Sequence, residues 1–300
     1  MDPHGEQGGG GPAPVLLLER GSAGWPSELA AIEAPPERLW LRGRPELLAA
    51  GRARIAVVGT RTPSPYGAAT AQRFAAELAR AGAVVVSGLA RGIDQAAHRG
   101  ALDAGGDSIA VLGSGVDRPW PAGPLAERLA REGLLLSELR PGSPARRHHF
   151  PLRNRLISGL ARGVLVVEAA SASGSLITAR WAADQNRSVW AIPGRIDHPM
   201  AAGCHRLIRE GASLIERPQE ILSDLGLLPA GQALPPRPAT PAGDRSLAER
   251  LLQALEGECW TADDLAELVA AEVASVLSAL VELELAGSVT RGPGGLYRLA

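Results

Sequence analysis

The 300-residue sequence predicts an α/β fold, a doubly wound and mostly parallel sheet, followed by a small C-terminal winged-helix domain. The first observation is a series of short, continuous apolar runs that alternate with helical stretches. Continuous runs are typical of parallel strands that helices cover on both faces. The second observation is a Pro/Ala-rich break at 227–244, and the third is a pattern of three helices and a Gly-rich hairpin after it.

The N-terminal part of the chain is predicted to lie outside the main core. Residues 1–14 are rich in Gly and Pro, so we expect a disordered tail. Residues 15–53 contain short apolar pieces, too few for a core of their own, and are predicted to be a lead-in wrapped on the main domain. The run 15–18 is too short to span a membrane and follows no basic segment, so the sequence predicts neither a signal peptide nor a membrane helix, and no membrane partner.

The main domain is predicted at 54–226, and its alternation of strands and helices is Rossmann-like. Its strands are expected at the β-rich apolar runs 55–58, 83–86, 108–112, 134–136, 164–167 and 188–192, with 213–215 as a weaker seventh.

The last part of the chain is predicted to be a linker at 227–244 and a winged-helix domain at 245–300. Helices are expected at 245–257 and at 272–286. Between them, another helix is expected to start after Thr261 as N-cap, with Asp264 three residues on. A hairpin around Gly-Pro-Gly-Gly follows at 288–299.

The charge of this domain argues against groove reading of DNA, the usual role of a winged helix. Residues 245–300 hold four arginines against nine acidic residues, a net charge of −5, and the would-be recognition helix 272–286 has three glutamates and no cation. Phosphates would repel it. We therefore favour a protein-interaction or self-association unit, and DNA contact through the Arg291 wing is the alternative.

Composition excludes several classes of site. The net charge is −1, so any nucleic-acid surface must be local, and all 31 basic residues are arginine, which excludes a Schiff-base or Walker-type lysine. Cys204 and Cys259 lie far apart, as expected of thiols in a reducing cytoplasm. His148 and His149 are adjacent, which is poor metal geometry. No metal and no cofactor is predicted, and neither GxGxxG nor GxxxxGK[ST] is present.

A basic run at 146–155 is the most informative stretch. It places four arginines, two histidines and Phe150 in ten residues, and no acidic residue lies between Leu139 and Val167 to neutralise them. Such a run is either a solvated loop or an anion-binding surface. We favour the second, because an aromatic ring among cations offers a face on which a base stacks.

Several strands run into Gly-rich or small-residue turns that include Arg61 and Arg91. Ligands bind at the carboxyl ends of strands in open α/β sheets, so these turns and the basic run are expected to converge on one edge as a track for phosphates. Glycines that merely permit tight turns are the alternative. The candidate nucleic-acid-binding residues in these turns and in the run are Gly59, Arg61, Ser87, Gly88, Arg91, Gly92, Gly113, Gly115, Arg146, Arg147, Phe150, Arg153, Asn154, Arg155, Ser173, Gly174 and Ser175.

Six motifs in order resemble those of the bacterial DNA-processing protein A family, DprA, also called Smf. They are Val58-Gly59-Thr60-Arg61, Ser87-Gly88-Leu89-Ala90-Arg91-Gly92-Ile93-Asp94 with Ala97-His98, Ala110–Gly115, Phe150–Arg155, Val167-Glu168-Ala169 with Ser173–Ala179, and Ile192-Pro193-Gly194. The likeness extends over about 25–226 and resumes weakly in the winged helix.

The resemblance implies a protein that binds single-stranded DNA, protects incoming strands in natural transformation and helps to load the RecA recombinase. It places the DNA pocket on Arg61, on Gly88–Asp94, on Arg147, Phe150 and Arg153–Arg155, and on Ser173–Thr178. It also implies a homodimer through the Rossmann-like domain. The chain departs from the family's pattern in its short N-terminal region, in Trp120-Pro121 where Tyr-Pro is usual, and in having arginine where relatives have lysine.

No catalytic residue is predicted. Asp94 and His98 share a helix face, but no nucleophile or second carboxylate stands beside them. We expect Asp94 to brace the pocket loop and His98 to be structural. Ser87 and Ser175 lack an activating base and a G-x-S-x-G elbow.

Two alternatives to a DNA-binding protein that is not an enzyme remain open. The first is a nucleotide-processing, phosphoribohydrolase-like enzyme, whose PGGxGT signature is missing at Ser171–Thr178. The second is a winged-helix transcription factor.

Overall fold

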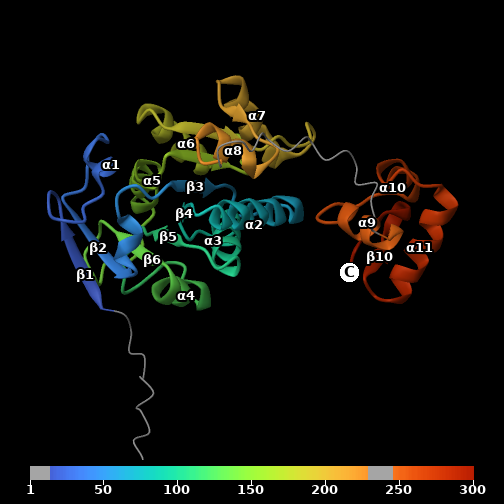
Figure 1. Cartoon of the computed structure of the whole chain (residues 1–300), viewed down its shortest axis with the longest axis horizontal. Helices are drawn as coiled ribbons and strands as arrows, with labels where there is room; N and C mark the ends of the chain where they lie inside the picture. Colours follow the sequence, from blue (N-terminus) through green and yellow to red (C-terminus); the bar gives the residue numbers. More distant parts are fainter. Residues whose placement is uncertain (1–13, 229–245) are drawn as a thin grey trace, which may run out of the picture. The chain divides into compact units, whose positions relative to one another are not determined.

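The computed structural model describes residues 14–228 and 246–300, which include a nine-stranded α/β unit and a C-terminal helical unit (Figure 1). The predicted tail lies almost entirely outside the described residues, and so does most of the predicted linker. No helix among the described residues is both long and apolar enough to cross a membrane.

The sheet has the strand order β1-β2-β6-β5-β4-β3-β7-β8-β9. All seven predicted strands are present and run parallel to one another. The strands are β1 Val15–Glu19, β2 Arg38–Gly43, β3 Arg54–Val58, β4 Val84–Ser87, β5 Ser108–Val111, β6 Leu134–Ser137, β7 Gly163–Val166, β8 Ser188–Ala191 and β9 Ser213–Leu214. Every residue of β3 to β7 is buried, as continuous apolar runs predict.

Helices lie on both faces of the sheet, so the predicted doubly wound fold is confirmed. They are α1 Ser27–Ala30, α2 Pro65–Arg80, α3 Ile93–Asp103, α4 Pro124–Glu132, α5 His149–Leu160, α6 Ser175–Asp184 and α7 Ala202–Arg209, with short 3-10 turns at Pro45–Leu48 and Pro199–Ala201. Helix α8, Pro218–Asp224, follows β9 in the chain. One apolar core joins α1, α5, α6 and α7 to one face. A second joins α3 and α4 to the other (Figure 1).

The strand order contains a switch point between β3 and β7. These two strands are parallel neighbours, and from them the chain continues to β4 on one side and to β8 on the other. The turns that follow β3 and β7 therefore diverge and leave a crevice at the carboxyl edge of the sheet, which is where open α/β sheets bind ligands.

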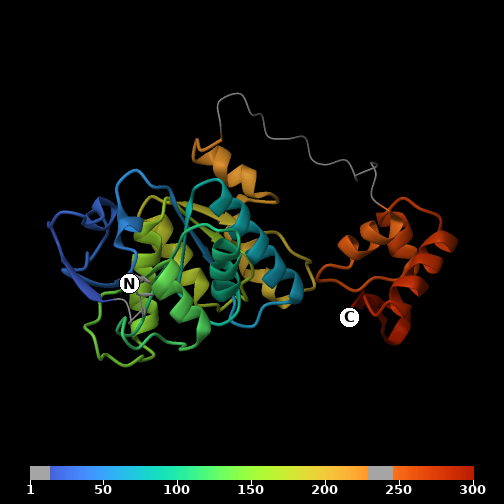
Figure 2. The ribbon, with the colours of Figure 1, turned by 60° about the horizontal axis from the view of Figure 1, so that its bottom comes forward.

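The N-terminal lead-in adds two strands that the sequence did not predict. β2 pairs antiparallel with β6, and β1 pairs antiparallel with β2, so both lie at one edge of the sheet (Figure 2). The prediction of a lead-in wrapped on the main domain was therefore incomplete. The apolar run 15–18 is an edge strand whose side chains are mostly exposed.

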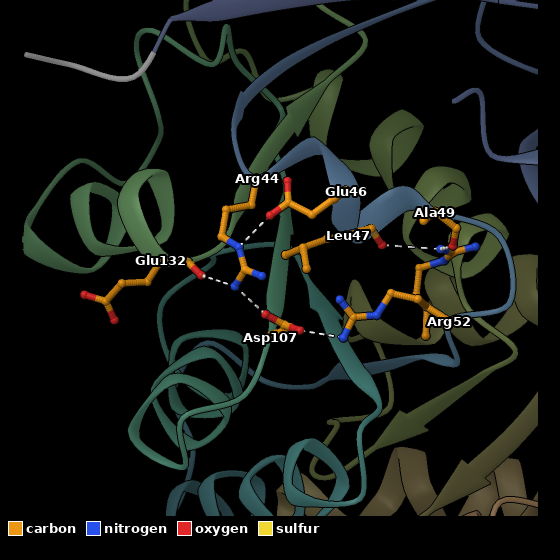
Figure 3. Close-up of polar contacts among 8 residues, drawn as sticks. Arg44, Glu46, Leu47, Ala49, Arg52, Asp107 and Glu132 are labelled. Atoms are coloured by element: carbon orange, nitrogen blue, oxygen red, sulfur yellow. Dashed lines mark hydrogen bonds and ion pairs between the residues drawn. The ribbon is translucent and has the colours of Figure 1, made fainter. Parts of the chain in front are cut away.

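Ion pairs attach the segment between β2 and β3 to the sheet. Asp107, just before β5, lies between Arg44 and Arg52 and accepts from them at 2.6 and 2.5 Å (Figure 3). Arg54 is buried and donates to the carbonyl of Leu160 at 2.9 Å and to the Glu28 carboxylate. These contacts lie at the amino ends of the parallel strands, away from the crevice.

The C-terminal unit has the predicted winged-helix elements. They are α9 Leu247–Ala254, α10 Ala262–Leu268 and α11 Val273–Leu285, followed by β10 Val289–Arg291 and β11 Tyr297–Leu299, which pair antiparallel around a 3-10 turn at Pro293–Gly295. The expected N-cap is confirmed, because the Thr261 hydroxyl accepts from the Asp264 N–H in a capping box. The wing residue Arg291 stacks over Tyr297.

Candidate nucleic-acid interface

A cavity of about 590 Å³ opens at the switch point between β3 and β7. Its walls come from the turns after β3, β4 and β7, and from one face of α5 with the residue Arg147 before it. The predicted site residues that line it are Gly59, Arg61, Asp94, Arg147, Phe150, Arg153, Asn154, Ser173, Gly174, Ser175 and Thr178. Residues from four separated stretches of sequence are thus brought to one site.

Helix α5 presents most of the basic run to this cavity. The helix begins at His149, and Pro151 lies in its first turn, where a backbone N–H has no partner within the helix. Phe150, Asn154 and Ile157 are spaced to share one helix face, and all three line the cavity. The His149 imidazole contacts the Gly113 carbonyl at 3.2 Å and helps to hold this end of the helix.

The Phe150 ring is held between two turns. The Arg61 guanidinium lies over the ring, 5.6 Å from its centroid. On the Gly113 side, a Cβ at that position would stand 3.0 Å from a ring carbon, so glycine there allows the ring to approach. The ring remains only half-buried, so part of it faces the cavity.

Three of the predicted arginines have no acidic partner among the described residues. Arg61, Arg91 and Arg147 form no ion pair within the described part of the chain. Unpaired guanidiniums around a cavity are suited to phosphate, which they bind as a planar fork.

Arg153 lies beneath the cavity and joins α5 to the strand ends. It is buried, and its guanidinium donates to the Gly88 carbonyl at 2.8 Å and to the Val111 carbonyl. Burial lowers its pKa to about 10, opposed by the charge of Asp94. A Cβ on Gly88 would lie 2.6 Å from the guanidinium, so a glycine is needed there. These contacts give Arg153 a positioning role.

The expectation that no acidic residue neutralises the arginines of the run is wrong for Arg155. Its guanidinium donates to both carboxylate oxygens of Glu138, at 2.7 and 2.9 Å, and is almost fully buried. Glu138 lies just before the acid-free stretch, at the end of β6, and folding brings it next to α5. Arg155 therefore fixes α5 to the sheet and does not face the cavity.

The predicted bracing role of Asp94 is confirmed. Its carboxylate accepts from the Gly88 N–H at 3.1 Å, and burial raises its pKa to about 6 against the opposing charge of Arg153. His98 is also buried, and its Nδ1 contacts the Ser108 hydroxyl at 2.7 Å. Burial lowers the pKa of His98 to about 3, so the ring is neutral at pH 7. The hydroxyls beside them, those of Ser87 and Ser108, are fully buried and donate to the Val57 and Val85 carbonyls, so these hydroxyls are held in the fold and do not face the cavity.

The N-terminus of α6 forms the opposite wall of the cavity. The Ser173 and Ser175 hydroxyls lie 2.7 Å apart, and the Asn154 amide donates to the Gly174 carbonyl at 3.3 Å. Gly174 has φ of −62°, and nothing lies within 4 Å of the place where its Cβ would stand. The positive end of the helix dipole and the absence of a side chain leave this wall open to an anionic group.

A second cavity of about 360 Å³ adjoins the first. It adds the predicted residues Gly88 and Arg91. Its other lining residues include Ala90, from the predicted Gly88–Asp94 turn, and Thr62 and Trp120, which the sequence did not identify as part of a site, although Trp120-Pro121 was noted as a departure from the family pattern.

The remaining predicted residues line neither of these two cavities. Ser87 is buried and donates to the Val57 carbonyl, Gly92 has a positive φ at the start of α3, and Gly115 donates to the Ser143 carbonyl. Arg146 is exposed on the loop before α5. The contacts of Ser87, Gly92 and Gly115 fit roles in shaping the turns.

Comparison with known proteins decides the family. The model of DNA recombination-mediator protein A matches residues 17–226, and the DprA winged helix domain matches 235–295. The chain belongs to the DNA recombination-mediator protein A (DprA) family. It is 42% identical to Protein Smf of Escherichia coli over 294 residues, which cover 94% of this chain and 77% of that protein.

Two solved structures share the fold. DNA processing protein A from Streptococcus pneumoniae is 41% identical with a TM-score of 0.67, over 71% of this chain and 74% of that one. The protein from Helicobacter pylori, for which a single-stranded DNA binding mode is described, is 30% identical with a TM-score of 0.64, over 70% of this chain and 95% of that one. A further relative, the putative DNA processing protein DprA of Mycobacterium tuberculosis, is 42% identical over 84% of this chain and 66% of its own length. The resemblance that the motifs indicated is confirmed.

Proposed function

We propose that this DprA family protein binds single-stranded DNA in the cavity between the β3 and β7 turns. The observation that supports this most strongly is that Phe150 lies under the unpaired guanidinium of Arg61 and lines the same cavity as the unpaired Arg147. A ring and two forked cations suit an unpaired base and its flanking phosphates. Base pairing in a duplex would keep that base stacked and out of reach of the ring.

The binding is expected to be tolerant of sequence and sensitive to salt. The cavity offers cations, backbone groups and a ring face, which every nucleotide can use. For single strands, the logarithm of the affinity falls with the logarithm of salt concentration with a slope of about −0.7 for each phosphate neutralised.

The deciding experiment measures the affinity of a labelled oligothymidine by fluorescence anisotropy at several KCl concentrations. Phe150→Ala removes the stacking face and is expected to weaken binding by about 1–3 kcal/mol, and Arg61→Gln should weaken binding and flatten the salt dependence. Arg80→Gln is the matched control, because Arg80 is an exposed arginine at the far end of α2, near the amino end of β4.

Unchanged affinity in both Phe150→Ala and Arg61→Gln would overturn this assignment. A preference for duplex over single strands would also count against it and would favour groove reading.

We further propose that binding proceeds without turnover. Asp94 and His98 are buried and engaged in structural contacts, and Ser175 pairs with Ser173 rather than with a base. Incubation with nucleoside monophosphates should release no free base. Release that depends on Asp94 would instead support the nucleotide-processing alternative.

Family membership supports two finer proposals. The protein delivers incoming single strands to a RecA-type recombinase in the cytoplasm during natural transformation, and it acts as a homodimer. Light scattering after size-exclusion chromatography tests the dimer. Recombinase filament formation on strands coated with single-strand binding protein, with and without this protein, tests the delivery.

A further inference from the structure

The second cavity shares part of its lining with the first. Arg61, Ala90 and Phe150 line both cavities, so the stacked pair of Arg61 and Phe150 forms the wall between them. The two cavities lie in sequence along the carboxyl edge of the sheet. The first is at the turns after β7, β3 and β4, and the second is at the turns after β3, β4 and β5.

The far wall of the second cavity is Trp120, with Pro121 beside it. Trp120 is 55% exposed, and among the described residues it takes part in no ring contact or arginine stack. An indole of this size left open to solvent contributes little to the core, whereas tryptophan is common where a protein binds an aromatic partner. Burial in the core therefore does not account for this side chain.

The second cavity is lined by cations as well as by aromatic rings. Arg91 lines it together with Arg61, and Gly88 contributes only backbone. Arg91 has no acidic partner in the described residues, so its guanidinium is available to an anion. Two rings and two forked cations around one cavity have the chemistry that recognises a nucleotide, which is a flat base joined to a phosphate.

We propose that Trp120 is a second stacking platform and that the second cavity holds the base next to the one bound against Phe150. The strand then passes over the wall formed by Arg61 and Phe150, with one base on each side of it, and Arg91 binds the phosphate on the Trp120 side. This inference rests on the proposed function, because it assumes that single-stranded DNA occupies the first cavity.

The test uses the full chain and the same labelled oligothymidine. Trp120→Ala should weaken binding about tenfold, within the range of roughly 5- to 150-fold that loss of one base-stacking ring produces. Trp120→Phe keeps a ring and should bind within about threefold of the unchanged protein. Leu17→Ala is the control, because Leu17 is 51% exposed on the edge strand β1, five strands away from β3 in the sheet.

Tryptophan fluorescence provides a readout that a structural role would not change. Stacking of a base on an indole quenches its emission, so the unchanged protein should lose fluorescence when oligothymidine binds. Trp120→Phe should lose that quenching while it still binds. The thermal midpoint of Trp120→Ala shows whether that variant folds. If it does not, the fluorescence of Trp120→Phe still tests the proposal.

The possible outcomes separate this inference from the proposed function. If Trp120→Ala binds as well as the unchanged protein while Phe150→Ala binds weakly, the second platform is wrong and the first cavity stands. If Trp120→Phe binds as poorly as Trp120→Ala, or keeps the full quenching, stacking on Trp120 is also ruled out. If neither Phe150→Ala nor Arg61→Gln changes affinity, the proposed function fails and this inference fails with it.

Discussion

Gly174 and Gly59 both line the first cavity, but for different physical reasons. A Cβ on Gly59 would stand 2.6 Å from the Ile93 side chain and 2.9 Å from the Glu168 carbonyl oxygen, whereas a Cβ on Gly174 would meet nothing. Gly59→Ala should therefore lower the free energy of unfolding by about 1–3 kcal/mol. Gly174→Ala should keep full stability and weaken oligonucleotide binding several-fold, because the methyl group takes up space in the cavity.

Denaturant titration and anisotropy on the same two variants check this pair. Equal affinity for Gly174→Ala and the unchanged protein would mean that the DNA does not approach this wall.

Asp94 and His98 should affect acid stability in opposite directions. The folded pKa of Asp94, about 6, lies above its ordinary 3.8, so its contribution to stability is present at low pH and is lost as the pH rises through 6. The folded pKa of His98, about 3, lies below its ordinary 6.5, so its contribution is present at neutral pH and is lost as the pH falls. From pH 7 to 4.5, each effect amounts to about 2 kcal/mol.

Two variants separate these effects. Asp94→Asn removes the stability that the Asp94 carboxyl adds at low pH. The free energy of unfolding of this variant should therefore fall more steeply on acidification than that of the unchanged protein. His98→Gln removes the destabilisation that His98 causes at low pH. The free energy of unfolding of this variant should therefore fall less on acidification than that of the unchanged protein. Urea denaturation at the two pH values measures the difference, and parallel behaviour of all three proteins would contradict the burial argument.

At the scale of single elements, helix α5 connects the fold to the site. Arg153 and Arg155 fix it from below, while Phe150 and Arg147 line the cavity. Arg153→Met should lower the thermal midpoint and weaken DNA binding with no change in salt dependence, because its charge holds the helix and does not contact phosphate. Arg147→Gln should instead leave the midpoint unchanged and reduce the salt slope by about 0.7.

A change of salt slope in Arg153→Met would assign that arginine to direct phosphate contact. Thermal scans and salt titrations of both variants decide between the two roles.

The segment between β2 and β3 depends on one carboxylate. Asp107 is 18% exposed and pairs with both Arg44 and Arg52 (Figure 3). Asp107→Asn should lower the free energy of unfolding by about 1–2 kcal/mol and leave DNA affinity unchanged, because this network lies at the amino ends of the strands. Asp103→Asn is the control, since Asp103 is half exposed and forms a single surface pair with Arg128. An equal loss of unfolding free energy in Asp107→Asn and Asp103→Asn would show that the network stabilises the fold no more than one surface ion pair does.

At the scale of the whole molecule, local patterns in the sequence predicted every strand of the parallel sheet and the winged-helix elements. The uninterrupted apolar runs allow only buried strands, and Thr261 with Asp264 marks a helix start whatever surrounds it. The edge strands β1 and β2 were missed, because their pairing depends on β6, about a hundred residues further on.

The sequence predicted which residues gather at the cavity, but not what each arginine does there. Glycine and arginine at strand ends indicate an anion site, yet whether an arginine faces the cavity or the core depends on residues that only folding brings close. Glu138 next to Arg155 and the Val111 carbonyl next to Arg153 are of this kind. Trp120 was overlooked as a lining residue because it follows its strand by several residues and stands outside the basic run.

The contact between Arg61 and Phe150 has an energetic consequence. The guanidinium lies over the ring, so a nucleobase that bound here would either share the phenyl group with that cation or push it aside. Replacing either residue alone also removes the partner's support, and the two losses should therefore be non-additive. A double-mutant cycle of Arg61→Gln and Phe150→Ala measures this coupling, and it would be near zero if the two side chains acted independently.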